Sequence, residues 1–173
     1  RADELQLYKT FIDSQDSGVQ STYRIFAERE LALKAIDTES KVDIKKHYDY
    51  LVSNLDMLST HFNDYSHSNF SAVESAITFR RIFELALLQG DLNTGKQLAY
   101  WYEEKIGLQW CRRNLHKIMI GELYRTLAYY YFLLNNSAKA RRYIKYASYY
   151  AGSYNFPKKA QRYIKYASHY ADF

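Results

Sequence analysis

The chain has very few residues that make tight turns, and this shortage restricts its fold more than any other feature of the sequence. One proline and six glycines occur among 173 residues. A protein built of small sheets needs turn-forming residues roughly every ten positions. The long stretches between the glycines are rich in Leu, Ala, Lys, Arg, Glu and Gln, which favour helices. The sequence therefore predicts an all-α fold.

Apolar side chains recur at spacings of three and four along most of the chain, as they do on one face of a helix. Breaks in this pattern divide the chain into about eight helices. The predicted ranges are about 3–14, 19–36, 41–62, 71–87, 92–106, 109–134 and 138–152, with a last helix that begins near Pro157. Short connections make successive helices antiparallel neighbours, so we expect stacked hairpins.

Length, apolar runs and cysteine content restrict the class of protein. The length suits one domain with its own core, and no apolar run approaches the roughly 18 residues of a membrane span. Cys111 is the sole cysteine, which excludes an internal disulfide and suits a reducing compartment. Residues 1–4 contain neither an apolar signal core nor an initiating methionine. We therefore expect a cytoplasmic protein with no membrane partner, and the chain can be a fragment of a longer one.

Charge is distributed unevenly along the chain. Residues 1–100 hold 11 Lys and Arg against 15 Asp and Glu, whereas residues 101–173 hold 13 against 4. Thirteen of the 19 tyrosines also follow residue 100. This asymmetry favours either an anionic partner for the basic half or pairing between the halves, within one chain or between copies.

The two segments that flank Asn135 and Asn136 carry large and small side chains in a regular order. Small residues let paired helices approach each other, and large ones fill the gaps between them. The positions that carry this order are Tyr124, Leu127, Ala128, Tyr131, Ala140, Ile144 and Ala147. In spacing and residue type the hairpin resembles a tetratricopeptide repeat, with Gly152 in place of the closing proline.

An upstream hairpin, residues 79–102, resembles the same repeat more weakly. Phe79, Ile82 and Gly95 match the pattern. Phe83 and Tyr102, however, stand where small residues are expected. The two turns are about 45 residues apart instead of about 34, so the helices are longer, as in the peptide-sensing regulators of Gram-positive bacteria and their phages. The resemblance implies one domain over 1–173, with divergent hairpins over 1–69, two repeat-like hairpins over 70–152 and a duplicated capping helix over 153–173.

Stacked hairpins of this kind form an α-solenoid, and the first helix of each pair lines its concave wall. The resemblance therefore implies a non-catalytic scaffold that binds a peptide or protein segment there, and such a scaffold can be the sensor part of a peptide-responsive regulator. The implied ligand-binding residues are Arg80, Glu84, Arg125, Tyr129 and Phe132. The two arginines either hold a carboxylate or phosphate of the ligand or pair with acids of adjacent helices.

A second repeat lies within the basic half. Residues 139–151 recur as residues 159–171, with 11 of 13 positions identical. The copied unit is one helix without its partner, and two interpretations stay open. The copy either caps the solenoid or, together with its twin, forms a basic, tyrosine-rich surface for binding or self-association.

The basic residues of these two segments suggest nucleic-acid binding as an alternative function. Cations neutralise phosphates, and aromatic rings stack on bases. The basic residues are Arg141, Arg142, Lys145, Arg162 and Lys165, interleaved with Tyr146 and Tyr166. A helical stripe on the first segment is expected to be core, which leaves fewer tyrosines for a ligand. That stripe is Ala140, Tyr143, Ile144, Ala147 and Tyr150.

Three local patterns resemble catalytic or metal-binding motifs without completing them. Residues 90–97 nearly spell a phosphate-binding loop, but the preceding segment is helical and Gln97 replaces the required hydroxyl residue. His61, Asp64 and His67 surround a helix end with no fourth metal ligand nearby. Cys111 has no histidine or acid placed to activate it, so a buried, inert thiol is expected. We therefore expect a protein that is not an enzyme and that holds neither a metal nor a cofactor.

Overall fold

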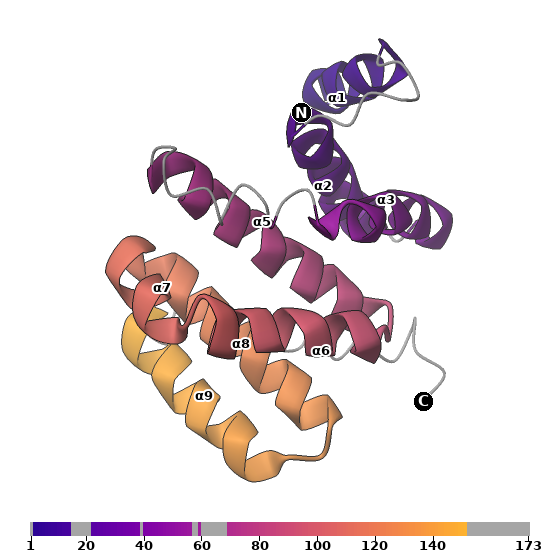
Figure 1. Cartoon of the computed structure of the whole chain (residues 1–173). Helices are drawn as coiled ribbons and strands as arrows, with labels where there is room; N and C mark the ends of the chain where they lie inside the picture. Colours follow the sequence, from indigo (N-terminus) through magenta and orange to yellow (C-terminus); the bar gives the residue numbers. More distant parts are fainter. Residues whose placement is uncertain (1, 15–21, 39, 57–58, 60–68, 152–173) are drawn as a thin grey trace. The chain divides into compact units, whose positions relative to one another are not determined.

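Every regular element in the described part of the chain is a helix, as the sequence predicts (Figure 1). The computed structural model describes residues 2–14, 22–38, 40–56, 59 and 69–151. The chain groups into two compact units, Arg1–Leu85 and Ala86–Phe173, each of which is described by itself. None of the helices within these residues is both long and apolar enough to cross a membrane. The single domain and its predicted internal boundaries stay predictions.

Three helices of the first unit pack in chain order. α1 (Ala2–Ser14) contacts α2 (Thr22–Asp37), and α2 pairs more extensively with α3 (Lys41–Ser53). Their core consists of apolar side chains at helical spacing, and alanines on α2 let the helices approach closely. The buried core residues include Ile25, Leu31, Ala32, Ala35, Ile44 and Leu51.

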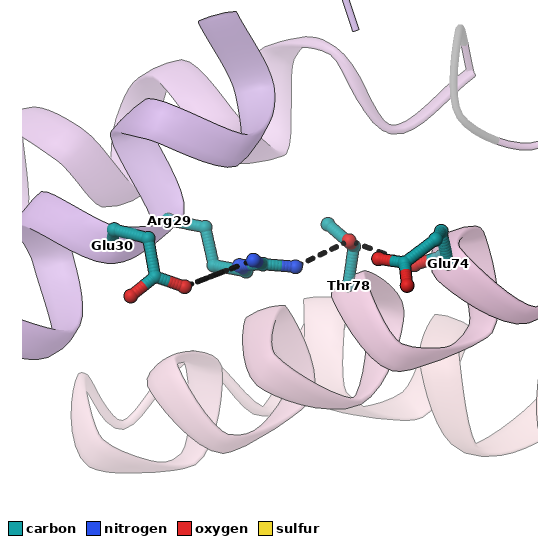
Figure 2. A network of polar contacts seen from close by, with 4 residues as sticks. All are labelled: Arg29, Glu30, Glu74 and Thr78. Atoms are coloured by element: carbon teal, nitrogen blue, oxygen red, sulfur yellow. Dashed lines mark hydrogen bonds and ion pairs between the residues drawn. The ribbon is translucent and has the colours of Figure 1, made fainter. Parts of the chain in front are cut away.

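A longer helix, α5 (Asn69–Leu88), begins in the first unit and ends in the second. Within the first unit a polar network joins α5 to α2, and Figure 2 shows its four residues. Arg29 Nη1 donates to Thr78 Oγ1 at 3.0 Å, and Arg29 Nη2 donates to Glu30 Oε1 at 2.9 Å. Thr78 Oγ1 donates in turn to the backbone carbonyl of Glu74 at 2.9 Å. The Arg29 guanidinium therefore bridges two helices that are distant in sequence.

α3 is shorter than the predicted helix over residues 41–62. It begins after Ser40, whose Oγ donates to Asp43 Oδ2 at 2.8 Å, and it ends at Ser53. Asn54 leaves the helical conformation with φ −114° and ψ 15°, and its Nδ2 donates to the carbonyl of Tyr50 at 2.8 Å. An asparagine side chain that competes for backbone carbonyls favours the end of a helix.

Up to residue 151, where its described part ends, the second unit contains four α-helices and one π-helix after the end of α5. α6 (Leu92–Tyr100) continues into the π-helix η1 (Trp101–Lys105), and α7 (Leu108–Asn114), α8 (Lys117–Leu133) and α9 (Ser137–Ala151) follow. α8 and α9 form the most extensive helix pair in the described residues. Both helices of the pair contribute buried alanines: Ala128, Ala140 and Ala147. These small side chains allow the close approach that the sequence predicts for this hairpin.

The predicted helix over residues 109–134 is divided into α7 and α8, so this prediction is wrong. Leu115 is buried with an extended backbone, φ −96° and ψ 149°. His116 then caps α8, because its Nδ1 accepts a hydrogen bond from the N–H of Ile118 at 3.3 Å. Histidine is an unusual cap, and neither glycine nor proline marks the break. Hydrophobic periodicity alone therefore misses it.

The stretch that resembles a phosphate-binding loop is a corner between α5 and α6. Gly90 has a positive φ of 71°. Asp91 caps α6: its Oδ1 accepts from the Thr94 N–H at 3.1 Å and its Oδ2 from the Thr94 hydroxyl at 2.7 Å. Because a helix precedes the turn, the predicted helix–turn–helix corner is confirmed.

We predict that Gly107→Ala destabilises the chain, because Gly107 adopts φ +80° and ψ 140° between η1 and α7. A Cβ at this position would meet nothing within 4 Å, so the cost is backbone strain alone, about 1–3 kcal/mol. Gly95→Ala in α6 is the control, since its Cβ would lie 3.4 Å from Leu87 and Tyr130 at ordinary contact distance. Urea denaturation should show a lower free energy of unfolding for Gly107→Ala only. Equal free energies of unfolding for the two variants would contradict the predicted backbone strain at position 107.

Candidate functional site

The five residues predicted to line a concave wall divide between the two units. Arg80 and Glu84 lie on α5 in the first unit, and the other three lie on α8 in the second. Arg80 is 5% exposed, and its Nη1 donates to Glu84 Oε2 at 2.7 Å. Arg81 Nη1 lies 3.7 Å from the same oxygen. The Arg80 guanidinium is therefore neutralised by an acid one turn away on its own helix.

The residues on α8 differ in exposure. Arg125 is buried, Tyr129 is half-buried and Phe132 is 60% exposed. Burial raises the pKa of Tyr129 to about 12, so its hydroxyl stays protonated at neutral pH. Of the five predicted residues, Phe132 is the one that presents most of its side chain to solvent. The role of these five residues in ligand capture stays a prediction.

The predicted basic surface begins on α9. Arg141, Arg142 and Lys145 are all exposed there. Their counterparts in the copied segment, Arg162 and Lys165, lie outside the described residues. The structure thus brings three cations together on the solvent-exposed side of one helix.

Another side of α9 packs against α8. Of the predicted core stripe, Tyr150 is half-buried and three residues are fully buried: Ala140, Tyr143 and Ala147. Ile144 is 40% exposed, so its predicted place in the core is wrong. It shares the exposed surface of α9 with Tyr149, which is 82% exposed. The buried stripe is therefore narrower than the sequence suggests, and an apolar and an aromatic side chain accompany the cations.

A cavity of about 700 Å³ lies in the first unit, and the sequence did not predict it. Its walls come from α1, α2 and α3, and most of the lining side chains are charged. Ile12, Leu31 and Ala35 supply the apolar part of the lining. A ligand in this cavity would meet both charged and apolar groups.

Glu28 is the buried acid of the cavity. Both it and His47 are buried, and His47 Nδ1 pairs directly with Glu28 Oε2. Arg24 Nε lies 3.8 Å from Glu28 Oε1, and the Arg24 guanidinium lies 4.5 Å from the centre of the Tyr50 ring. A buried carboxylate needs such partners, because burial without them is costly. Glu28 thus joins α2 to α3 and has little negative charge left for a ligand.

Three lysines line the same cavity, one from each helix: Lys9 on α1, Lys34 on α2 and Lys46 on α3. In the described part of the chain, no hydrogen bond or ion pair engages their ammonium groups. Of the lining acids, Glu28 is held by its partners and Asp43 accepts from Ser40. A hydrogen bond from a neutral hydroxyl does not cancel the charge of a carboxylate, so two acids remain, Asp13 and Asp43. Three lysines still outnumber these two acids, and the cavity favours an anionic group.

The sequence contains a signal for the buried Glu28–His47 pair of this cavity, although not for the cavity itself. Glu28 shares a helix face with Leu31, Ala32 and Ala35, which are buried. His47 similarly follows Ile44 by three positions in α3. An acid and a histidine on the apolar faces of consecutive helices indicate a buried pair. The cavity itself depends on the packing of three helices, which spacing does not reveal.

A second acid, Glu103, whose side chain is 12% exposed, organises the second unit. The hydroxyls of Tyr131 on α8 and Tyr143 on α9 both donate to its carboxylate. Lys139 Nζ lies 3.1 Å from Glu103 Oε2 and donates to the Tyr131 hydroxyl at 2.9 Å. Burial, followed by the bond to Glu103, raises the pKa of both tyrosines. This cluster holds η1, α8 and α9 together.

Two further sequence predictions concern reactive or metal-binding residues. Cys111 is buried, as predicted, and burial raises its pKa to about 12, so it is a thiol at neutral pH. His61, Asp64 and His67 lie outside the described residues. Elsewhere, in the residues that the structure does describe, no three His, Cys, Asp or Glu side chains gather as metal ligands.

We predict that Glu103→Ala destabilises the chain strongly, by about 3 kcal/mol, because it leaves two tyrosine hydroxyls without their acceptor and Lys139 without its ion-pair partner. Glu104→Ala is the matched control, since Glu104 is the next residue in η1 and is exposed. Its loss should change stability by less than about 0.5 kcal/mol. Urea denaturation of both variants measures the difference, and equal stabilities would show that Glu103 does not hold the helices together.

Comparison with protein families, curated proteins and solved structures finds no match to this chain. The resemblance to a tetratricopeptide repeat therefore stays a prediction that rests on the chain's own residues.

Proposed function

We propose that the chain is a non-catalytic scaffold that binds an acidic peptide or protein segment in the cavity of the first unit. The observation that carries this proposal is the set of three lysines, one from each wall, whose ammonium groups have no acid partner in the described residues. The cavity volume of about 700 Å³ lies in the range of ligand sites. A reducing, cytoplasmic setting belongs to the proposal and is supported by the lone buried thiol of Cys111.

The lining of the cavity suits a peptide with both acidic and apolar side chains. Carboxylates of the ligand can pair with Lys34 and Lys46, while Leu31 and Ala35 contact an apolar side chain. Lysine ammonium groups are flexible point charges, so they tolerate different spacings of the ligand's carboxylates. This tolerance suits a scaffold or a sensor of peptides, and such a sensor can be part of a peptide-responsive regulator.

We predict that the double variant Lys34→Glu/Lys46→Glu loses affinity for acidic peptides. Each reversal replaces attraction with repulsion worth about 0.5–1 kcal/mol at a solvated site, so the dissociation constant should rise about tenfold. The probe is a displayed library of random octapeptides, enriched on the unaltered chain and then measured singly by calorimetry. We expect the enriched peptides to be rich in Asp and Glu.

Lys45→Glu is the matched control, because Lys45 neighbours Lys46 on α3 but does not line the cavity. Its ion pair with Asp49, at 2.9 Å, is exposed and contributes little to stability. Lys45→Glu should leave peptide affinity within about twofold of the unaltered chain. Failure of the library to enrich any sequence, or an equal loss in both variants, would overturn the proposed site.

A specific observation also favours the alternative function, nucleic-acid binding. Arg141, Arg142 and Lys145 are exposed on α9 beside the exposed ring of Tyr149. Cations of this kind neutralise phosphates, and an exposed ring can stack on a base. α9 therefore carries both components of a single-strand binding surface.

We predict that, if this surface binds nucleic acid, its affinity for a single-stranded oligonucleotide falls steeply with added salt. Three phosphate contacts contribute about −2 to the slope of log affinity against log salt concentration. Fluorescence anisotropy should show that slope disappear in Arg141→Gln/Arg142→Gln/Lys145→Gln. The control Lys105→Gln/Arg113→Gln/Lys117→Gln removes the same charge from exposed positions off α9. Equal slopes in both triple variants would exclude α9 as the binding surface.

A further inference from the structure

α9 is held in place by a small set of specific contacts. Tyr143 bonds to Glu103, and Lys139 contacts both Glu103 and Tyr131. We call the surface formed by Glu103, Tyr124 and Tyr131 the α9 seat. Three rings of α9 surround Tyr124 with centroid distances of 5.4–5.7 Å: Tyr143, Tyr146 and Tyr150. Two buried alanines complete the packed face of the helix, Ala140 and Ala147.

The copied segment repeats every one of these contact residues twenty positions later. The counterparts are Lys159, Ala160, Tyr163, Tyr166, Ala167 and Tyr170. The copy differs from α9 at two positions only, where Gln161 replaces Arg141 and His169 replaces Tyr149. Arg141 and Tyr149 are exposed on α9. All differences between the two segments therefore fall where α9 faces solvent, and none falls where it meets the seat.

We propose that residues 159–171 are a second occupant of the α9 seat in the same chain. A helix of this sequence in the seat would offer Lys159 and Tyr163 to Glu103, and Tyr166 and Tyr170 to Tyr124, in the same geometry as α9. The proposal uses the contacts of α9 and the sequence of the copy, which lies outside the described residues. It is independent of the peptide site proposed in the first unit.

The length of the chain that connects each segment to α8 determines whether α9 or the copy occupies the seat more often. α9 follows α8 after residues 134–136, whereas the copy would be reached through residues 134–156. Because the entropy of closing a loop scales with the logarithm of its length, the shorter connection favours α9 by roughly twentyfold. The same chain supplies the copy at an effective concentration that a second chain reaches only near millimolar levels. The exchange is therefore intramolecular.

The test is a double-mutant cycle in the full chain, read as the equilibrium constant for unfolding in urea. Ala147→Arg blocks the buried face of α9, so the copy should take the seat and the folding equilibrium should weaken by only about twentyfold. Ala167→Arg alone should change it by no more than about twofold. The double variant blocks both occupants and should weaken folding by more than about a hundredfold beyond Ala147→Arg.

Four outcomes would overturn the proposal. If Ala147→Arg and the double variant are equally unstable, or if Ala147→Arg does not fold, the copy cannot replace α9. If Ala167→Arg alone is strongly destabilising, the copy buries its stripe at another place. Unfolding midpoints that change with a tenfold change in protein concentration would show exchange between chains instead, which also contradicts the intramolecular form.

A milder cycle and a matched control complete the experiment. Tyr143→Phe removes the hydroxyl that bonds to Glu103 and leaves the ring. It should therefore become markedly more destabilising when Tyr163→Phe removes the same hydroxyl from the copy, and additive effects would contradict the exchange. The control pair is Ser148→Arg and Ser168→Arg, because Ser148 is exposed on α9. Each of these two changes should alter the equilibrium constant for unfolding by no more than about twofold, and their effects on the free energy of unfolding should add.

Discussion

In each unit of this chain one carboxylate fixes the helix packing: Glu28, which is buried, in the first and Glu103, which is half-buried, in the second. Glu28 on α2 is satisfied by His47 on α3 and by Arg24 one turn away. Glu103 on η1 is satisfied by groups from both α8 and α9. An acid that loses such partners inside a protein is strongly destabilising, so each carboxylate demands one arrangement of the helices around it. Apolar stripes bring the helices together, and these acids determine how they fit.

The same two acids also determine which basic residues are paired inside the protein and which remain available to bind a partner. Glu28 is occupied by Arg24 and His47, so the lysines that line the cavity keep their charge for a ligand. Glu103 engages Lys139, the one basic residue of α9 that is half-buried, while the other three basic residues of that helix face solvent. In each unit, some basic residues thus stabilise the fold through a carboxylate, while others remain available to bind a partner.

The fold class could be predicted from sequence because it depends on local information. Scarce turn residues and helical periodicity predict the helices, and Gly90 and Gly107 mark real breaks because both have positive φ. The break at Leu115 carries no such marker. The π-helix, which places Glu103 against two other helices, has no signal in the spacing of apolar residues either. Arg80 illustrates a further limit: its partner Glu84 is visible four positions away, yet its burial depends on tertiary packing.

Duplication of one helix has different consequences for its two faces. The packed face of α9 is constrained by the seat, and under the proposed exchange the copy can occupy the seat because it keeps Tyr163 and Ala167. The solvent face has no such constraint and is free to change, as Gln161 and His169 show. Under the proposed exchange, the helix in the seat would expose His169 where α9 exposes Tyr149. It would also carry the neutral Gln161 where α9 carries the cationic Arg141. Two nearly identical helices would then give one fold two different surfaces, and the one with Arg141 and Tyr149 is the better suited to phosphates and bases.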